Sequence, residues 1–175
     1  MSLADNRPAD FATIRIGDAL PAQTWTAEME DLLAFGDLLY PPRPDDPNRS
    51  TNPHVNEAYA KDSIYGGLFV DGNQTVAFLC RMITDWLPPA SLLAGFSNFD
   101  LRFPNPCRLG EVVTFSGIVA GKATEDGRDM VFLDVRATTQ AGKVVATGKI
   151  DVHVPRPQRA RAPDAINPAA ASAAR

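Results

Sequence analysis

A run of hydrophobic positions with helical spacing dominates the middle of this chain and predicts a helix from about Gly72 or Asn73 to Leu87. Pro88 follows Leu87 and stops the pattern. The apolar positions cover most of the helix circumference and are Val76, Ala77, Phe78, Leu79, Cys80, Met82, Ile83, Trp86 and Leu87. A helix that is apolar on most sides must be largely buried, so we expect other elements to wrap around it.

Four strand-like runs follow, at residues 96–103, 112–121, 130–140 and 144–154. Turn residues at 125–128 and 140–143 separate the last three runs and predict two hairpins. The last run alternates between apolar and polar positions, which places Val145 and His153 on the more polar face. We therefore expect His153 to be solvated and not catalytic.

The N-terminal part predicts smaller elements. We expect a strand near residues 13–16 and a helix that has Thr26 as its N-cap and ends at Gly36. A Pro-rich loop insertion occupies residues 38–51, and a short helix should cover 56–61.

These elements predict an α+β fold, in which one curved antiparallel sheet wraps around one long buried helix. The domain should span residues 11–154, between a flexible N-terminus at 1–10 and a disordered tail at 155–175. Such a sheet has an open edge, which favours a homodimer joined edge to edge.

Composition excludes several functions. The net charge is -4 without a basic run before the tail, which disfavours a nucleic-acid partner, and no apolar run is long enough to span a membrane. Cys80 and Cys107 are the two cysteines, and they form no CxxC pair. We expect a reduced, cytoplasmic setting, with no metal site and no cofactor.

Asn52, Pro53 and His54 are the first candidates for chemistry. Pro53 fixes its own φ angle and extends Asn52, so both polar side chains are held in place. Histidine exchanges protons near neutral pH, which suits a general acid or base. A solvated loop histidine is the alternative interpretation.

Several motifs in sequence order resemble the MaoC-like acyl dehydratases and (R)-specific enoyl-CoA hydratases, which have the hotdog fold. They are Asn52-Pro53-His54, Asn56, Ala60, Tyr65-Gly66-Gly67-Leu68-Phe69-Val70-Asp71-Gly72, Asp100-Leu101-Arg102-Phe103-Pro104-Asn105-Pro106 and Gly110-Glu111. The resemblance implies an acyl thioester of coenzyme A or of a carrier protein as the substrate. It also implies that His54 and an aspartate hold the water that adds to the double bond, that Asn52 positions this water, and that Asn56 contributes to substrate binding.

The sequence departs from the family pattern at the acid. The family has Gly-Asp shortly before Asn-Pro and an aliphatic residue between Pro and His, whereas here His54 follows Pro53 directly. Asp37, after Gly36, matches the family acid only if the Pro-rich loop bulges outward. Asp45 or Asp46 could replace Asp37, or the position could be empty.

A further departure is Asp71, where the family usually has His before Gly. Gly72 would begin the long helix, where its free N–H could hold a developing oxyanion; a turn residue is the alternative. Asp71 is either an N-cap or a catalytic acid. Arg102 and Arg108 are candidates for the phosphates of coenzyme A, with a solvated surface arginine as the alternative.

Three functions follow. The first is hydration or dehydration of an acyl thioester through His54, Asp37, Asn52 and Gly72. The second is thioester hydrolysis that uses Asp71. The third is a non-catalytic acyl-binding subunit that completes a hetero-oligomer with a paralogue.

Overall fold

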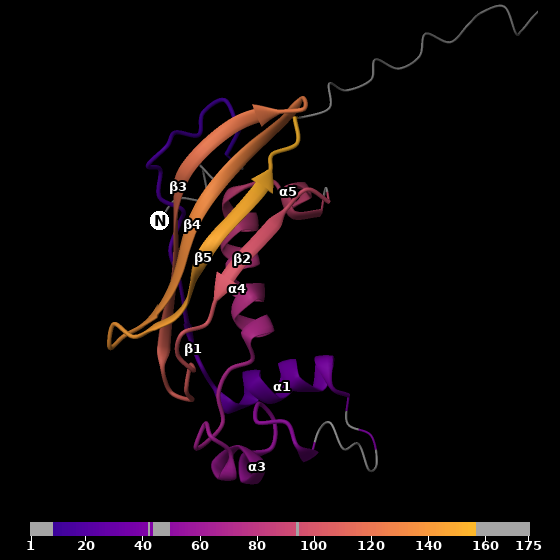
Figure 1. The fold of residues 1–175 in the computed structure, drawn as a ribbon, viewed down its shortest axis with the longest axis vertical. Helices are drawn as coiled ribbons and strands as arrows, with labels where there is room; N and C mark the ends of the chain where they lie inside the picture. Colours follow the sequence, from indigo (N-terminus) through magenta and orange to yellow (C-terminus); the bar gives the residue numbers. More distant parts are fainter. Residues whose placement is uncertain (1–8, 42, 44–49, 94, 157–175) are drawn as a thin grey trace, which may run out of the picture.

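The computed structural model describes residues 9–41, 43, 50–93 and 95–156. Five antiparallel strands in these residues form one curved sheet, in the order β1-β3-β4-β5-β2, and α4 lies across its inner side (Figure 1). The strands are β1 (Gln23–Thr26), β2 (Asn98–Arg102), β3 (Val112–Glu125), β4 (Arg128–Thr139) and β5 (Val144–His153). The helices are α1 (Met29–Leu39), α3 (Glu57–Asp62), α4 (Gly72–Trp86) and α5 (Ala90–Leu93). The predicted α+β class is confirmed.

Both predicted hairpins are present. β3 and β4 meet at Asp126 and Gly127, whose φ angles of 49° and 75° suit a two-residue turn between twisted strands. β4 and β5 meet at 140–143, where Gly142 has a φ of 79°. The strand pairing shifts register near this turn, between Ala137 and Thr138.

That register shift corrects the predicted alternation of β5. Val145, expected on the polar face, is buried beside Ala146, because the irregular pairing turns two consecutive side chains inward. His153 is half-buried rather than solvated, since the ring of Phe96 covers it at 5.8 Å between centroids.

The long predicted helix is confirmed as α4, but it is buried on one face only. Leu79, Met82 and Ile83 are fully buried against the inner residues of the sheet. On the opposite side Ala77 is exposed and Cys80 is half-exposed, so the expectation that most sides are covered was too broad. Apolar residues on a helix do not by themselves require a covering element within the same chain.

The N-terminal predictions were partly wrong. Residues 13–16 form no strand, and the N-terminal strand is β1. Thr26 ends β1 instead of capping α1, and Glu28 takes the N-cap position without a side-chain hydrogen bond. The helix also continues past Gly36, because this glycine serves packing: a Cβ there would lie 2.1 Å from Val55 Cγ1.

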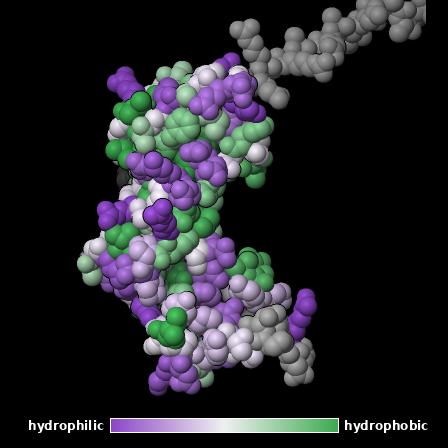
Figure 2. Space-filling model, in the orientation of Figure 1, coloured by the Kyte–Doolittle hydropathy of each residue, from purple (hydrophilic) through white to green (hydrophobic). Residues whose placement is uncertain are grey.

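α1 and α3 lie together at the end of the sheet where α4 begins (Figure 1). The predicted short helix is confirmed as α3, with Asn56 as its N-cap. In the space-filling view the surface is hollowed between the sheet and this helical layer (Figure 2). The segments that carry the candidate residues therefore come together around the start of α4.

Candidate active site

Asn52 holds the backbone of His54 in place. Its side chain is buried, and Oδ1 accepts a hydrogen bond from the His54 N–H at 2.9 Å. The carbonyl of Asn52 also accepts from the amides of Val55 at 3.3 Å and Asn56 at 3.0 Å. A tight turn results, and it presents the imidazole from a fixed backbone. The predicted role of Asn52 in holding water stays a prediction.

The His54 ring is fixed by a backbone carbonyl. Nδ1 lies 2.9 Å from the oxygen of Phe69, and the two rings meet edge to face with centroids 4.4 Å apart. A carbonyl can only accept, so Nδ1 carries the proton in this hydrogen bond. In the neutral ring, the lone pair then lies on Nε2.

Asp71 faces that lone pair. Its Oδ2 lies 3.8 Å from His54 Nε2, and the side chains of His54 and Asp71 are 21% and 10% exposed. This separation is too long for a direct hydrogen bond, but a water molecule can bridge the two groups. Among the described residues, the carboxylate paired with His54 is that of Asp71.

The second carboxylate oxygen of Asp71 begins α4. Oδ1 accepts from the backbone N–H of Asn73 at 2.8 Å and from its side-chain amide at 3.0 Å. The predicted N-cap is thus confirmed. One oxygen caps the helix while the other faces His54, which keeps the carboxylate from rotating.

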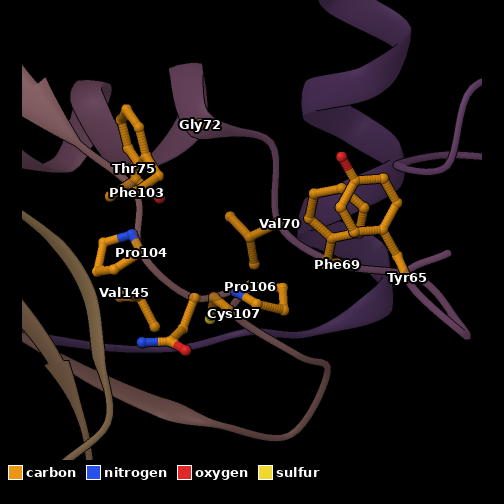
Figure 3. Close-up of a pocket in the computed structure, with 11 residues that line it drawn as sticks. Tyr65, Phe69, Val70, Gly72, Thr75, Phe103, Pro104, Pro106, Cys107 and Val145 are labelled. Carbon is orange, nitrogen blue, oxygen red and sulfur yellow. The ribbon is translucent and has the colours of Figure 1, made fainter.

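A cavity of about 280 Å³ adjoins the start of α4 (Figure 3). Its lining is mainly apolar and aromatic: Tyr65, Phe69, Val70, Gly72, Thr75, Phe103, Pro104, Asn105, Pro106, Cys107 and Val145. His54 and Asp71 are not in this lining, although Phe69 and Gly72 border both places. Burial raises the pKa of the Cys107 thiol to about 11, so this cysteine is a neutral part of the wall.

The other predicted site residues lie around this centre. Asp37 is exposed on the last turn of α1, next to Gly36, which contacts Val55. Asn56 caps α3 by accepting from the Tyr59 N–H at 3.0 Å, and its side-chain amide donates to the Ser50 carbonyl. Asp45 and Asp46 lie outside the described residues.

The sequence did not predict the contacts that Phe69 and Arg108 make at the site, although Phe69 lies in a family motif and Arg108 was a candidate for binding phosphate. Phe69 contributes a backbone carbonyl, which has no sequence signature. Arg108 binds the segment before Phe69 instead of pointing into solvent. The antiparallel bridge between these two residues joins distant parts of the chain, which a local pattern does not reveal.

Two features are absent from the residues that the structure describes. No helix there is long and apolar enough to cross a bilayer. No group of three or more His, Cys, Asp or Glu side chains in the same residues could hold a metal ion.

Known proteins resemble this chain in sequence and structure. The family model of the MaoC like domain matches residues 50–141. An (R)-specific enoyl-CoA hydratase of Rhodospirillum rubrum is 35% identical over 107 residues, which cover 60% of this chain and 70% of the relative.

Two solved structures show the same fold. A MaoC-like dehydratase from R. rubrum has a TM-score of 0.65 and 24% identity, over 83% of this chain and 97% of that one. The ChsH1-ChsH2 complex from Mycobacterium tuberculosis has a TM-score of 0.63 and 19% identity, over 82% and 99%. The predicted hotdog arrangement is confirmed.

Proposed function

The chain belongs to the MaoC-like domain family, as the motifs predicted, and from that premise we propose that it hydrates enoyl thioesters reversibly. The substrate class is an enoyl group on coenzyme A or on a carrier protein. The single observation that carries the proposal is the pairing of His54 Nε2 with Asp71 Oδ2 across 3.8 Å, beside the start of α4.

His54 acts as the general base in the hydration direction. A water between His54 and Asp71 gives a proton to Nε2 while its oxygen adds to the β-carbon of the enoyl group. The bond from Nδ1 to the Phe69 carbonyl keeps Nε2 free for that proton. Nε2 then gives this proton to the α-carbon, which leaves the imidazole neutral again, and dehydration runs through the same steps in reverse.

Asp71 is the carboxylate that we assign to the reaction in place of Asp37. Its Oδ2 lies on the Nε2 side of the imidazole, where it can accept the second hydrogen of the same water. The family pattern places the acid before Asn-Pro, so this assignment moves it to the start of α4.

Gly72 supplies the oxyanion site in this proposal. Among the described residues, the Gly72 N–H has no hydrogen-bond acceptor, as is usual for the first turn of a helix. A thioester carbonyl placed there would gain stabilisation as negative charge develops on its oxygen. The adjoining apolar cavity then suits the hydrocarbon part of the substrate.

We propose that the working unit is a homodimer joined at the free edge of β2. In the described residues β2 pairs with β5 on one side only, and the large side chains of Phe96 and Phe103 beside it are 48% and 46% exposed. The ChsH1-ChsH2 complex makes a hetero-oligomer with a paralogue the alternative.

Two assays on the purified full chain separate the reactions. Loss of the crotonyl-coenzyme A absorbance reports hydration, and release of free thiol reports hydrolysis. We expect hydration, with kcat reduced about 100- to 10,000-fold in His54→Ala, the usual contribution of one acid–base group. His153→Ala is the matched control and should keep its activity. Thiol release that depends on Asp71, without hydration, would instead identify a thioesterase.

A further inference from the structure

Arg108 binds a loop rather than solvent. It lies half-buried between β2 and β3, and its guanidinium donates to the carbonyl oxygens of Gly67 at 2.6 Å and Leu68 at 3.2 Å. It also donates to the carbonyl of Tyr65 and lies 5.9 Å from the centre of the Phe69 ring. One side chain thus binds three carbonyls of the 65–68 segment, which precedes Phe69.

The carbonyls of the 65–68 segment need a hydrogen-bond donor from elsewhere in the chain. Gly66 and Gly67 have φ angles of 65° and 147°, a conformation outside regular helix and strand. Backbone carbonyls in such a segment have no partners in a helix or sheet ladder, and the five N–H donors of an arginine can satisfy several of them together.

The backbone of Arg108 is held in place by Glu111. Its backbone N–H donates to Glu111 Oε2 at 2.8 Å, and Lys143 Nζ lies 2.7 Å from Oε1 of the same carboxylate. Burial alone would raise the pKa of Glu111, but the bonds from Arg108 and Lys143 outweigh it and the pKa is lowered. Glu111 is therefore ionised at neutral pH, and it fixes the position from which the guanidinium reaches out.

The 65–68 segment leads directly to Phe69, whose carbonyl orients the His54 ring. Phe69 O receives the proton on His54 Nδ1, and the Phe69 backbone pairs with Arg108 in an antiparallel bridge. A shift of this carbonyl would remove the acceptor that keeps the proton on Nδ1. The lone pair on Nε2 would then no longer be assured.

We propose that Arg108 is a positioning residue for His54. By holding the 65–68 segment, it keeps the Phe69 carbonyl against Nδ1 and so maintains the tautomer in which Nε2 faces Asp71. The role of His54 as a base rests on the proposed function, whereas the link from Arg108 to the tautomer does not. The sequence alternative, a contact with coenzyme A phosphates, competes with the three bonds that the guanidinium already makes.

The test compares Arg108→Met and Arg108→Lys in the full chain. Methionine has a long side chain without a hydrogen-bond donor, and lysine offers a single ammonium group in place of the planar guanidinium. Two-bond ¹⁵N–¹H correlation spectra of histidine-labelled protein report the tautomer directly. The chain has two histidines, so a spectrum of His54→Asn assigns the signals. Spectra are recorded near pH 8.5, well above the ordinary histidine pKa of about 6.5.

We expect the His54 ring to be a single Nδ1–H tautomer in the wild type and a mixture in Arg108→Met, with Arg108→Lys between them. With crotonyl-coenzyme A, kcat should fall by up to about 100-fold in Arg108→Met while KM changes little. Arg128→Met is the matched control, because its guanidinium lies 4.2 Å from the Phe96 ring, away from His54, and its spectrum should be unchanged.

An unchanged His54 tautomer in either folded Arg108 variant would overturn the proposal. A raised KM with unchanged kcat would also overturn it and would favour a phosphate contact. Should Arg108→Met fail to fold, the spectrum of Arg108→Lys decides by the same criterion. If the wild type lacks hydratase activity but its tautomer depends on Arg108, the positioning role stands and the proposed function fails.

Discussion

At the scale of single residues, the two oxygens of Asp71 perform different tasks. Oδ1 caps α4 through the amide of Asn73, and Oδ2 faces His54 Nε2. Asparagine caps a helix about as well as aspartate does, so Asp71→Asn removes the charge with little effect on the cap. Alanine at this position would remove both.

We predict that Asp71→Asn lowers kcat by about 100-fold or more while the melting temperature stays close to that of the wild type. Asp71→Ala should lose activity and also about 0.5–2 kcal/mol of unfolding free energy. Enzyme assays and thermal unfolding measure the two effects separately. Asp37→Asn is the comparison and should remain active; an inactive Asp37→Asn beside an active Asp71→Asn would return the acid to α1.

The sequence marked His54 as a candidate but did not predict which carboxylate lies next to it. The residue type and the neighbouring Asn-Pro pair mark His54 as a candidate, because both are local features. Its contacts with Phe69 and Asp71 depend on how the chain returns after α3, a long-range property of the fold. The sequence indicated Asp71 chiefly as a cap, since capping is again a local signal.

At the scale of elements, local signals predicted α4 and the hairpins well. Fifteen residues of strong helical spacing define α4, and turn residues with positive φ define the hairpins. The predicted C-terminal end of α1 was wrong because Gly36 resembles a helix stop, whereas it lies within the helix and packs against Val55, where a Cβ would not fit. The alternation of β5 failed at Val145, where a register shift overrides the two-residue period.

An ion pair ties β4 to the segment that follows β5. Arg156 donates to both carboxylate oxygens of Asp129, at 2.7 Å from Nε and 3.0 Å from Nη2, and the Thr124 hydroxyl donates at 2.8 Å. Hydrogen bonds from Arg156 and then from Thr124 lower the pKa of Asp129 to about 2. The side chain of Asp129 is buried, although Arg156 is mostly exposed.

We predict that Asp129→Asn is less stable than the wild type at pH 7 and that this difference shrinks as the pH falls from about 4 to 2. An unfolded aspartate has a pKa of about 3.9, so the lower pKa in the folded state stabilises the fold above that value. The contribution disappears once the folded carboxylate is protonated. Urea unfolding at a series of pH values measures it. Asp126→Asn, at the exposed end of a surface pair with Arg128, is the control and should show no such trend.

At the scale of the whole molecule, the sheet has an edge strand, β2, that could pair with another strand. It ends in β2, whose outer edge has no partner among the described residues, and α4 leaves Ala77 exposed on its outer side. A second copy placed edge to edge would extend the sheet and cover part of this area.

We predict a mass twice that of the 18.9 kDa chain in light scattering at micromolar concentration. Backbone pairing along β2 and burial of Phe96 and Phe103 would stabilise this dimer. Co-expression with paralogues is the second arm of the experiment. A monomer that becomes a complex only with a paralogue would replace the homodimer by a hetero-oligomer.

The shared use of Asp71 also bears on how this protein can change over generations. In the proposed mechanism, a substitution at position 71 that removes both oxygens alters the start of α4 and the hydration chemistry together, because each depends on one oxygen of the same carboxylate. Asparagine, serine or threonine at this position would keep the helix cap without the charge. A related protein with one of these residues in place of the aspartate would keep the start of α4 but lack the carboxylate that faces the histidine, and it could then serve as a binding subunit without catalysis.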